Sequence, residues 1–143
     1  MSVRVGHGFD VHRLAAGRPL LLAGIAVPHH RGLQGHSDGD CVLHAVCDAL
    51  LGALAAGDMG AHFPSADPRW KGAQSRVFVE ETLRILRARG YEIENVDITV
   101  VAQEPTLAPH LPAMRESLAG LLGLAVDAVS VKAKSTDGLG AIG

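Results

Sequence analysis

Residues 93–102 place the tightest limit on the fold, because their side chains alternate between apolar and polar. The apolar members are Val96, Ile98 and Val100, and the polar ones are Asn95, Asp97 and Thr99. This period of two is typical of a β-strand with one buried face. Such a strand needs a partner strand and a layer of other elements over its apolar face. The chain must therefore build a sheet and pack helices against it.

Helical patterns lie on both sides of this strand. Apolar residues recur at helical spacing in residues 41–55, 75–89 and 109–123,. Further strands are expected at residues 3–9, at 19–27 as a strand or a hairpin around Gly24, and at 129–133. The order β-β-α-α-β-α-β predicts one α/β domain over residues 1–143, an α+β sandwich with a mixed sheet and helices on one face.

The second face of this sheet also needs a cover, because its strands are too apolar to meet water. Self-association of the chain is the simplest cover. Residues 138–143 have the composition of a loop. We therefore expect a final strand beyond the last residue of this sequence.

Composition excludes several classes of protein. Apolar residues make up 48% of the 143 residues and aromatic residues 3%, so the core must consist of Val, Leu, Ile and Ala. A net charge of −2 argues against a nucleic-acid polymer as partner,. The sequence has no apolar run long enough for a membrane helix. Cys41 and Cys47 point to different faces of one predicted helix, and reduced, buried thiols suit a cytoplasmic protein,.

Asp10, His12 and His44 form the strongest candidate for a metal site. In extended backbone, Asp10 and His12 project to the same side, and His44 lies near the start of the next helix,. Three ligands of these types leave a fourth position of zinc open, which is typical of a catalytic site. Asp48 shares a helix face with His44 and is its predicted outer partner. The alternative, polar turn residues and a buried structural histidine, is about equally compatible with the spacing.

Other polar segments carry weaker signals. His36 and Ser37 precede the helix that holds His44, a position that favours an anion such as phosphate,. Helix capping is the alternative, since Ser37, Asp38 and Asp40 are all competent N-caps. Asp58 could accept hydrogen bonds from substrate hydroxyls or simply form a turn. Residues 134–137 could hold phosphate and a hard cation such as magnesium.

Together these segments resemble the 2-C-methyl-D-erythritol 2,4-cyclodiphosphate synthase family. The resemblance is carried by VGHGFDVH at residues 5–12, HSDGD at 36–40, LHAVCDALLG at 43–52, GDMG at 57–60, NVDITVVAQ at 95–103 and VKAKSTDGLG at 131–140. It extends from residue 3 to the last residue, in the order of the family. Several long motifs in one order make the resemblance very specific.

The resemblance implies a phosphorus–oxygen lyase of the non-mevalonate pathway to isoprenoids. Such an enzyme converts 4-diphosphocytidyl-2-C-methyl-D-erythritol 2-phosphate into the cyclic 2,4-diphosphate and releases CMP. It implies zinc on Asp10, His12 and His44, and magnesium on the substrate diphosphate with help from Asp137. His36 and Ser135 would stabilise the transition state by hydrogen bonding.

The resemblance also implies the substrate contacts and the assembly. Residues 102–108 would hold the cytidine largely through backbone groups, and the family is a homotrimer with active sites between subunits. The implied contacts to substrate are Asp10, His12, His36, Ser37, Asp58, Gly60, Phe63, Asp67, Ala102, Pro105, Ala108, Lys134, Ser135, Thr136 and Asp137.

The sequence departs from the family at its C-terminal motif. Lys134, Ser135, Thr136 and Asp137 stand where the family usually has Thr-Thr-Thr-Glu. Ala141 replaces a common aromatic residue, which leaves isoprenoid diphosphate binding in a central channel of the trimer open. Two other functions would use the same site: a zinc hydrolase of phosphate esters, and a zinc-dependent trimeric scaffold without turnover.

Overall fold

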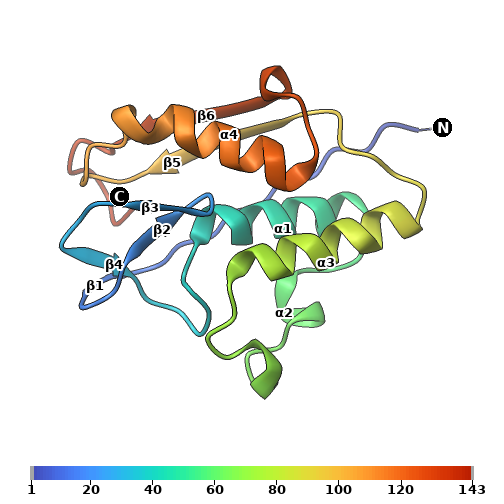
Figure 1. Ribbon diagram of the computed structural model, residues 1–143, viewed down its shortest axis with the longest axis horizontal. Coiled ribbons are helices and arrows are strands. Elements are labelled where there is room, and N and C mark those ends of the chain that lie inside the picture. Colours follow the sequence, from blue (N-terminus) through green and yellow to red (C-terminus); the bar gives the residue numbers. More distant parts are fainter. Residues whose placement is uncertain (1, 143) are drawn as a thin grey trace. The chain divides into compact units, whose positions relative to one another are not determined.

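The structure is a computed structural model that describes residues 2–142 (Figure 1). The chain forms two compact units, one that ends at Glu92 and one that begins at Ile93. Both units combine helices with strands, which confirms the predicted α/β class. The strands within the described part of the chain form three two-stranded sheets rather than one mixed sheet.

Two antiparallel strand pairs form the sheet structure of the first unit. β1 (Leu14–Ala16) pairs with β4 (Arg31–Leu33), and β2 (Leu20–Leu22) pairs with β3 (Ile25–Val27). The turn between β2 and β3 consists of Ala23 and Gly24, whose φ angles are 57° and 80°. Two positive φ angles are what a two-residue hairpin turn of type I′ requires. The predicted hairpin around Gly24 is confirmed.

Two long helices lie side by side in this unit (Figure 1). α1 (Cys41–Ala53) and α3 (Ser75–Ala88) bury their apolar faces, and Asp40 caps the start of α1. The residues that fill the interior from these helices are Val42, Leu43, Val46, Cys47, Leu50, Leu51, Phe78, Val79, Leu83 and Leu86. Both helices agree with the prediction to within two residues at each end.

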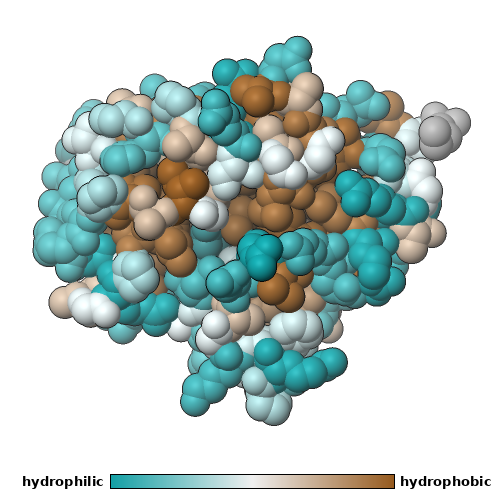
Figure 2. All heavy atoms as spheres, in the orientation of Figure 1, coloured by the Kyte–Doolittle hydropathy of each residue, from teal (hydrophilic) through white to brown (hydrophobic). Residues whose placement is uncertain are grey.

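Two short helical turns lie between α1 and α3. α2 (Met59–His62) begins after Asp58, and the 3₁₀ turn η1 (Pro68–Trp70) begins after Asp67. In both, a carboxylate accepts a hydrogen bond from a backbone N–H of the first turn, which offsets the nucleation cost of so short a helix,. Figure 2 shows hydrophilic side chains gathered around η1, at the bottom of the view.

The N-terminal segment corrects one prediction. The structure assigns no strand to residues 2–13, although residues 3–9 were expected to form one. The segment lies instead along α1: a Cβ atom on Gly6 or Gly8 would lie 1.8 Å from the carbonyl oxygen of Ala49 or Ala45. Glycine therefore permits a close approach of two backbones at these positions. The predicted strand at residues 3–9 is therefore wrong, and the segment packs against a helix instead.

The second unit consists of a parallel strand pair and one helix. β5 (Val96–Val101) pairs with β6 (Val129–Lys134), with Val96 opposite Val129 and Val101 opposite Lys134. Between them lie η2 (Ala108–His110), α4 (Leu111–Leu122) and η3 (Val126–Ala128), and α4 packs on the strand pair (Figure 1). Gly123 ends α4 with a φ of 70°,. Within the described residues, no helix is long and apolar enough to cross a membrane.

Candidate functional site

Three potential metal ligands converge in the first unit. The Nε2 atom of His12 lies 2.9 Å from Oδ2 of Asp10, and Nδ1 of His44 lies 3.2 Å from the same oxygen. The two ring nitrogens are 3.3 Å apart. Asp10 and His12 come from the extended segment held against α1, and His44 comes from the first turn of α1. The predicted convergence of these three residues is therefore present.

The spacing of these atoms fits a four-coordinate metal ion. Zinc with bonds of about 2.0–2.2 Å separates neighbouring tetrahedral ligands by about 3.3–3.6 Å. The three distances, 2.9, 3.2 and 3.3 Å, need only a small expansion to reach this range. The side chains of His12 and Asp10 are 13% and 25% exposed, so the site is partly shielded but open on one side. The group can therefore hold a divalent metal.

The outer nitrogens of both histidines have oxygen partners. Nδ1 of His12 lies 3.2 Å from the carbonyl oxygen of Gln34, which can only accept a hydrogen bond,. Nε2 of His44 lies 2.9 Å from Oγ of Ser75. Asp48, the predicted partner of His44, accepts a hydrogen bond from the Met59 backbone instead. That prediction is wrong, because the His44 ring directs its outer nitrogen toward α3 rather than along α1.

Burial keeps the His12 imidazole in the form that binds metals. Desolvation lowers the pKa of His12, and the nearby His44 and Arg18 act in the same direction. The Asp10 carboxylate opposes them by attracting the protonated ring. A neutral imidazole has a free lone pair, which is the ligand form.

The loop before α1 holds its polar side chains in different directions. The side chain of His36 is exposed, so it is free to meet an anion. The Ser37 hydroxyl is buried and lies 3.2 Å from Nε2 of His44. Arg18 donates to the carbonyl oxygens of Gly35 and Ser37, at 3.2 and 3.0 Å. Sequence reasoning missed Arg18, because no motif connects it to this loop.

Asp40 fixes the same loop from inside the protein. Its carboxylate is completely buried and accepts hydrogen bonds from the backbone N–H groups of Ala23, Gly24 and Leu43. Burial raises the pKa of Asp40, while these three hydrogen bonds favour the ionised form. Asp40 thereby joins the β2–β3 turn to the start of α1.

Asp58 and Phe63, two of the predicted substrate contacts, make contacts within the protein. The Asp58 side chain accepts a hydrogen bond from Ala61, in the turn that also contains Gly60. Phe63 is buried against Trp70 and Phe78, with ring centroids 5.3 and 4.8 Å away. A direct contact of the Phe63 ring with substrate, as predicted, is therefore not supported.

Asp67 belongs to the same loop and pairs with a neighbouring cation. Its Oδ2 lies 2.6 Å from a guanidinium nitrogen of Arg69. Hydrogen bonds from Arg69 hold the pKa of the Asp67 carboxyl below its usual range. The carboxylate is thus ionised, and its orientation is set within η1.

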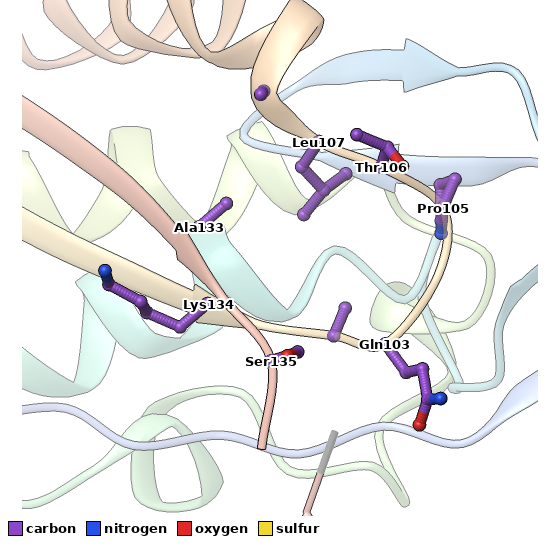
Figure 3. Close-up of a pocket in the computed structure, with 9 residues that line it drawn as sticks. Gln103, Pro105, Thr106, Leu107, Ala133, Lys134 and Ser135 are labelled. Carbon is purple, nitrogen blue, oxygen red and sulfur yellow. The ribbon is translucent and has the colours of Figure 1, made fainter. Parts of the chain in front are cut away.

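The second unit contains a pocket of about 250 Å³ at the carboxyl ends of β5 and β6 (Figure 3). Residues 102–108 curve around it after β5, and Lys134 and Ser135 border it at the end of β6. Of the predicted contacts, Ala102, Pro105, Ala108, Lys134 and Ser135 line this pocket. Gln103, Thr106 and Leu107 also line it and belong to the predicted segment 102–108, whereas Ala133 was not predicted.

Thr136 and Asp137 lie beyond this pocket. The Thr136 hydroxyl donates to the carbonyl oxygen of Ile142 at 2.9 Å, so it serves the local turn. Asp137 has a φ of 55°, and its Oδ1 accepts a hydrogen bond from Ser135 at 3.3 Å. The exposed carboxylate of Asp137 has a free side for a cation, but the structure supplies no second ligand for one among the contacts of this turn.

Comparisons with known proteins agree with the resemblance in the motifs. A model of the YgbB family matches residues 3–143. The 2-C-methyl-D-erythritol 2,4-cyclodiphosphate synthase of Cereibacter sphaeroides strain ATH 2.4.9 is 51% identical over the whole chain and 90% of its own length. The enzyme of the same name from Laribacter hongkongensis is 54% identical, over the whole chain and 88% of its own length.

Solved structures give the same result. A 2C-methyl-D-erythritol-2,4-cyclodiphosphate synthase in a CDP-bound form superposes with a TM-score of 0.91 and 43% identity, over 95% of this chain and 91% of that one. The bifunctional IspDF from Campylobacter jejuni also gives 0.91, at 41% identity, over 96% of this chain and 37% of that one. The chain therefore belongs to the YgbB family, together with these cyclodiphosphate synthases.

Proposed function

We propose that this protein converts 4-diphosphocytidyl-2-C-methyl-D-erythritol 2-phosphate into 2-C-methyl-D-erythritol 2,4-cyclodiphosphate and CMP, a step of the non-mevalonate isoprenoid pathway. It is a phosphorus–oxygen lyase, like the synthases to which it is more than half identical. The observation that carries this function is the convergence of Asp10, His12 and His44 on one point. Both units would belong to one functional domain, since the family match spans them.

We further propose zinc as the metal at Asp10, His12 and His44. Two imidazoles and one carboxylate suit zinc, and three protein ligands leave a position for a substrate oxygen. Zinc bound there supplies a positive charge that orients and polarises phosphate oxygens. Magnesium would accompany the substrate diphosphate, with Asp137 as a protein ligand. Asp137 is one methylene shorter than the glutamate usual in the family, so its carboxylate reaches less far from the backbone.

The reaction needs no nucleophile from the protein. An oxygen of the 2-phosphate attacks the β-phosphorus in line, the bond from the β-phosphorus to the CMP oxygen breaks, and CMP leaves with that electron pair. Catalysis then consists of positioning and of charge neutralisation on the equatorial oxygens. The exposed His36 side chain and the Ser135 hydroxyl would donate hydrogen bonds to these oxygens. Arg18 supports this by holding the backbone on either side of His36.

The substrate would extend over several further groups of the protein. The pocket of residues 102–108, with Lys134 and Ser135, would take the cytidine monophosphate end. Its backbone groups can recognise a base edge, and the Lys134 ammonium can meet a phosphate. Asp58 and Gly60 would contact the methylerythritol hydroxyls. Asp67 would contribute to substrate binding by holding the η1 segment in place through its ion pair with Arg69.

We also propose a homotrimer with active sites between subunits, located in the cytoplasm. The segment along α1 presents Val3, Val5, Phe9 and Val11, which are 63–90% exposed, although apolar side chains of this size favour a cover,. Light scattering after gel filtration should give three times the mass of the chain, 14.9 kDa. A monomer at micromolar concentration would contradict the assembly. Isoprenoid diphosphate binding in a trimer channel stays an open prediction because of Ala141.

The decisive experiment is incubation with the cytidylyl substrate, zinc and magnesium in water labelled with oxygen-18. Phosphorus NMR should reveal a cyclic diphosphate, and mass spectrometry should find no label in either product. Labelled phosphate products would indicate a hydrolase instead. Substrate consumption limited to one equivalent per site would indicate a binding protein. His44→Ala should abolish turnover and lose the zinc; full turnover by this variant without metal would refute the mechanism.

A further inference from the structure

A buried serine, Ser75, and an aspartate, Asp38, lie on the side of the His44 ring that faces away from Asp10 and His12. Ser75 is the first residue of α3 and is 0% exposed. Its Oγ lies 2.9 Å from Nε2 of His44 and donates a short hydrogen bond to Oδ1 of Asp38. The other carboxylate oxygen of Asp38 accepts the backbone N–H of Ser75 at 2.9 Å. The three side chains therefore form a continuous chain of hydrogen bonds.

The direction of these hydrogen bonds follows from the chemistry of the groups. An ionised carboxylate only accepts, so the Ser75 hydroxyl must donate to Asp38. The lone pairs of Ser75 Oγ then face His44, and Nε2 of His44 must carry the proton that is donated to them. Nδ1 of His44 keeps its lone pair on the side of Asp10 and His12, 3.2 and 3.3 Å away. This tautomer is the one that a metal at the site requires.

Two other side chains, Ser37 and Asp48, lie near His44, but neither is as well placed as Ser75 to accept a hydrogen bond from its Nε2–H. Ser37 Oγ lies 3.2 Å from Nε2 of His44, farther than Ser75 Oγ at 2.9 Å. It also accepts the Gly39 N–H at 3.3 Å and lies 3.4 Å from the Ser75 hydroxyl, whereas Ser75 is oriented by the Asp38 carboxylate. Asp48 accepts a hydrogen bond from the Met59 backbone N–H at 2.9 Å, whereas Nε2 of His44 faces Ser75. The Asp38 loop is in turn fastened to the start of α3, because Asp38 N–H donates to Ala73 and Gly72 N–H donates to His36.

We propose that Asp38 and Ser75 are a positioning pair that holds His44 in its Nε2–H tautomer and thereby sets the metal affinity of the site. Ser75 at the start of α3 thus orients a metal ligand on α1, and Asp38 in the loop before α1 orients Ser75. The proposal rests on the metal site of the proposed function but not on the reaction. Loss of such an outer partner lowers metal affinity by about 10–100-fold.

The test compares Ser75→Ala with Thr82→Val. Thr82 is also on α3 and 0% exposed, and its hydroxyl donates to the Phe78 carbonyl, so its removal is a matched loss of a buried hydroxyl. Zinc affinity is measured on metal-free protein by competition with a chromophoric chelator. Ser75→Ala should bind zinc at least about tenfold more weakly than the parent, and Thr82→Val within about twofold of it. Equal zinc affinity in Ser75→Ala and the parent, or equal weakening by both substitutions, overturns the proposal.

A second measurement needs neither zinc nor turnover. Two-bond proton–nitrogen NMR correlations report the tautomer of each histidine ring in metal-free protein. The parent should show His44 with its proton on Nε2, and Ser75→Ala should show a mixture of tautomers. A parent with the proton on Nδ1 overturns the proposal. A parent that binds no zinc but shows the Nε2–H tautomer would support the positioning pair while contradicting the metal site.

Two further variants, Ser75→Cys and Asp38→Asn, test the proposal if Ser75→Ala does not fold. Ser75→Cys keeps nearly the same shape, but its thiol is a much weaker hydrogen-bond partner. It should weaken zinc binding in the same direction as Ser75→Ala. Asp38→Asn keeps the side-chain shape and removes the charge that orients the hydroxyl, so it should also weaken zinc binding. Parental affinity in both variants would overturn the proposal.

Discussion

Asp40 offers the sharpest test of how this fold is held together. Its buried carboxylate accepts Ala23 N–H at 3.0 Å and Leu43 N–H at 3.1 Å on Oδ1, and Gly24 N–H at 2.7 Å on Oδ2. The substitution Asp40→Ala removes the acceptor of all three. Loss of an N-cap costs about 1 kcal/mol, and each further bond to a charged acceptor about 1.5 kcal/mol or more. We therefore expect a loss of about 4 kcal/mol in the free energy of unfolding.

Asp40→Asn separates these contributions. The amide can keep its oxygen at the Oδ1 position, where the bonds from Ala23 and Leu43 remain. Its NH₂ group then faces the Gly24 N–H, donor against donor, so this one bond is lost. The expected cost is about 2 kcal/mol, half that of Asp40→Ala.

The measurement is urea unfolding at neutral pH, followed by the fluorescence of Trp70, the single tryptophan of the chain. The denaturant slope should be the same for the three proteins, so that midpoints can be compared directly. The reasoning is refuted if Asp40→Ala costs less than about 1 kcal/mol, the value of an exposed cap alone. It is also refuted if Asp40→Asn costs as much as Asp40→Ala.

The pH dependence of the same variants follows from the raised pKa of Asp40. Because burial raises this pKa above the ordinary 3.8, the folded protein binds the Asp40 proton more readily than the unfolded chain. The corresponding stability is fully present below pH 3.8 and is lost as the pH rises through the folded pKa,. The parent should therefore lose stability relative to Asp40→Asn across this window. A parallel course of the two unfolding free energies from acid to neutral pH would contradict the direction.

Three further predictions concern the backbone and the thiols. Gly8→Ala should abolish zinc binding although no metal ligand is changed. Its Cβ would lie 1.8 Å from the Ala45 carbonyl oxygen and would displace the segment of Asp10 and His12 from α1. The zinc content of the protein after dialysis measures this. Gly120→Ala, with no atom within 4 Å of the new Cβ, should keep the zinc and raise the free energy of unfolding by up to about 1 kcal/mol,. Burial raises the pKa of Cys41 and Cys47 to about 12, so iodoacetamide near pH 8 should label these thiols only after unfolding,. The labelling is measured by mass spectrometry. Rapid labelling of the native protein would contradict the prediction.

The parts of the fold that local patterns specify were predictable. The β2–β3 hairpin depends on Gly24, and the ends of α3 and α4 depend on Gly90 and Gly123, which all have positive φ angles. The segment of residues 3–9 was not predictable in this way. Gly6 and Gly8 lie against the backbone of α1 in this segment. Only the location of a neighbour distinguishes such a segment from a strand, and the sequence of the segment does not contain that location.

In the metal site, too, the features set by residues close together in the sequence were predictable, and those set by distant residues were not. Asp10 and His12 could be predicted to point the same way because they lie two residues apart, and His44 because it follows a polar turn at a helix start. The outer partner of His44 could not be predicted by the same logic. Asp48 has the right helical spacing, but Ser75, 31 residues away in the sequence, holds the ring. A side chain that rotates away from its own helix is oriented by tertiary packing, and helical periodicity carries no signal for that.

The two aspartates before α1 show how much the fold adds to a motif. From the sequence, Asp38 and Asp40 are equivalent candidates for a helix cap. In the structure, Asp40 caps α1 and binds the hairpin turn, whereas Asp38 binds Ser75 behind the metal ligand His44. Substitution of Asp40 should thus chiefly lower stability, and substitution of Asp38 should chiefly lower zinc affinity. In regular extended backbone two residues at this spacing would share one side. Gly39 lies between them with a φ of 80°, so the chain turns there. The two carboxylates therefore reach different neighbours, the hairpin for Asp40 and α3 for Asp38.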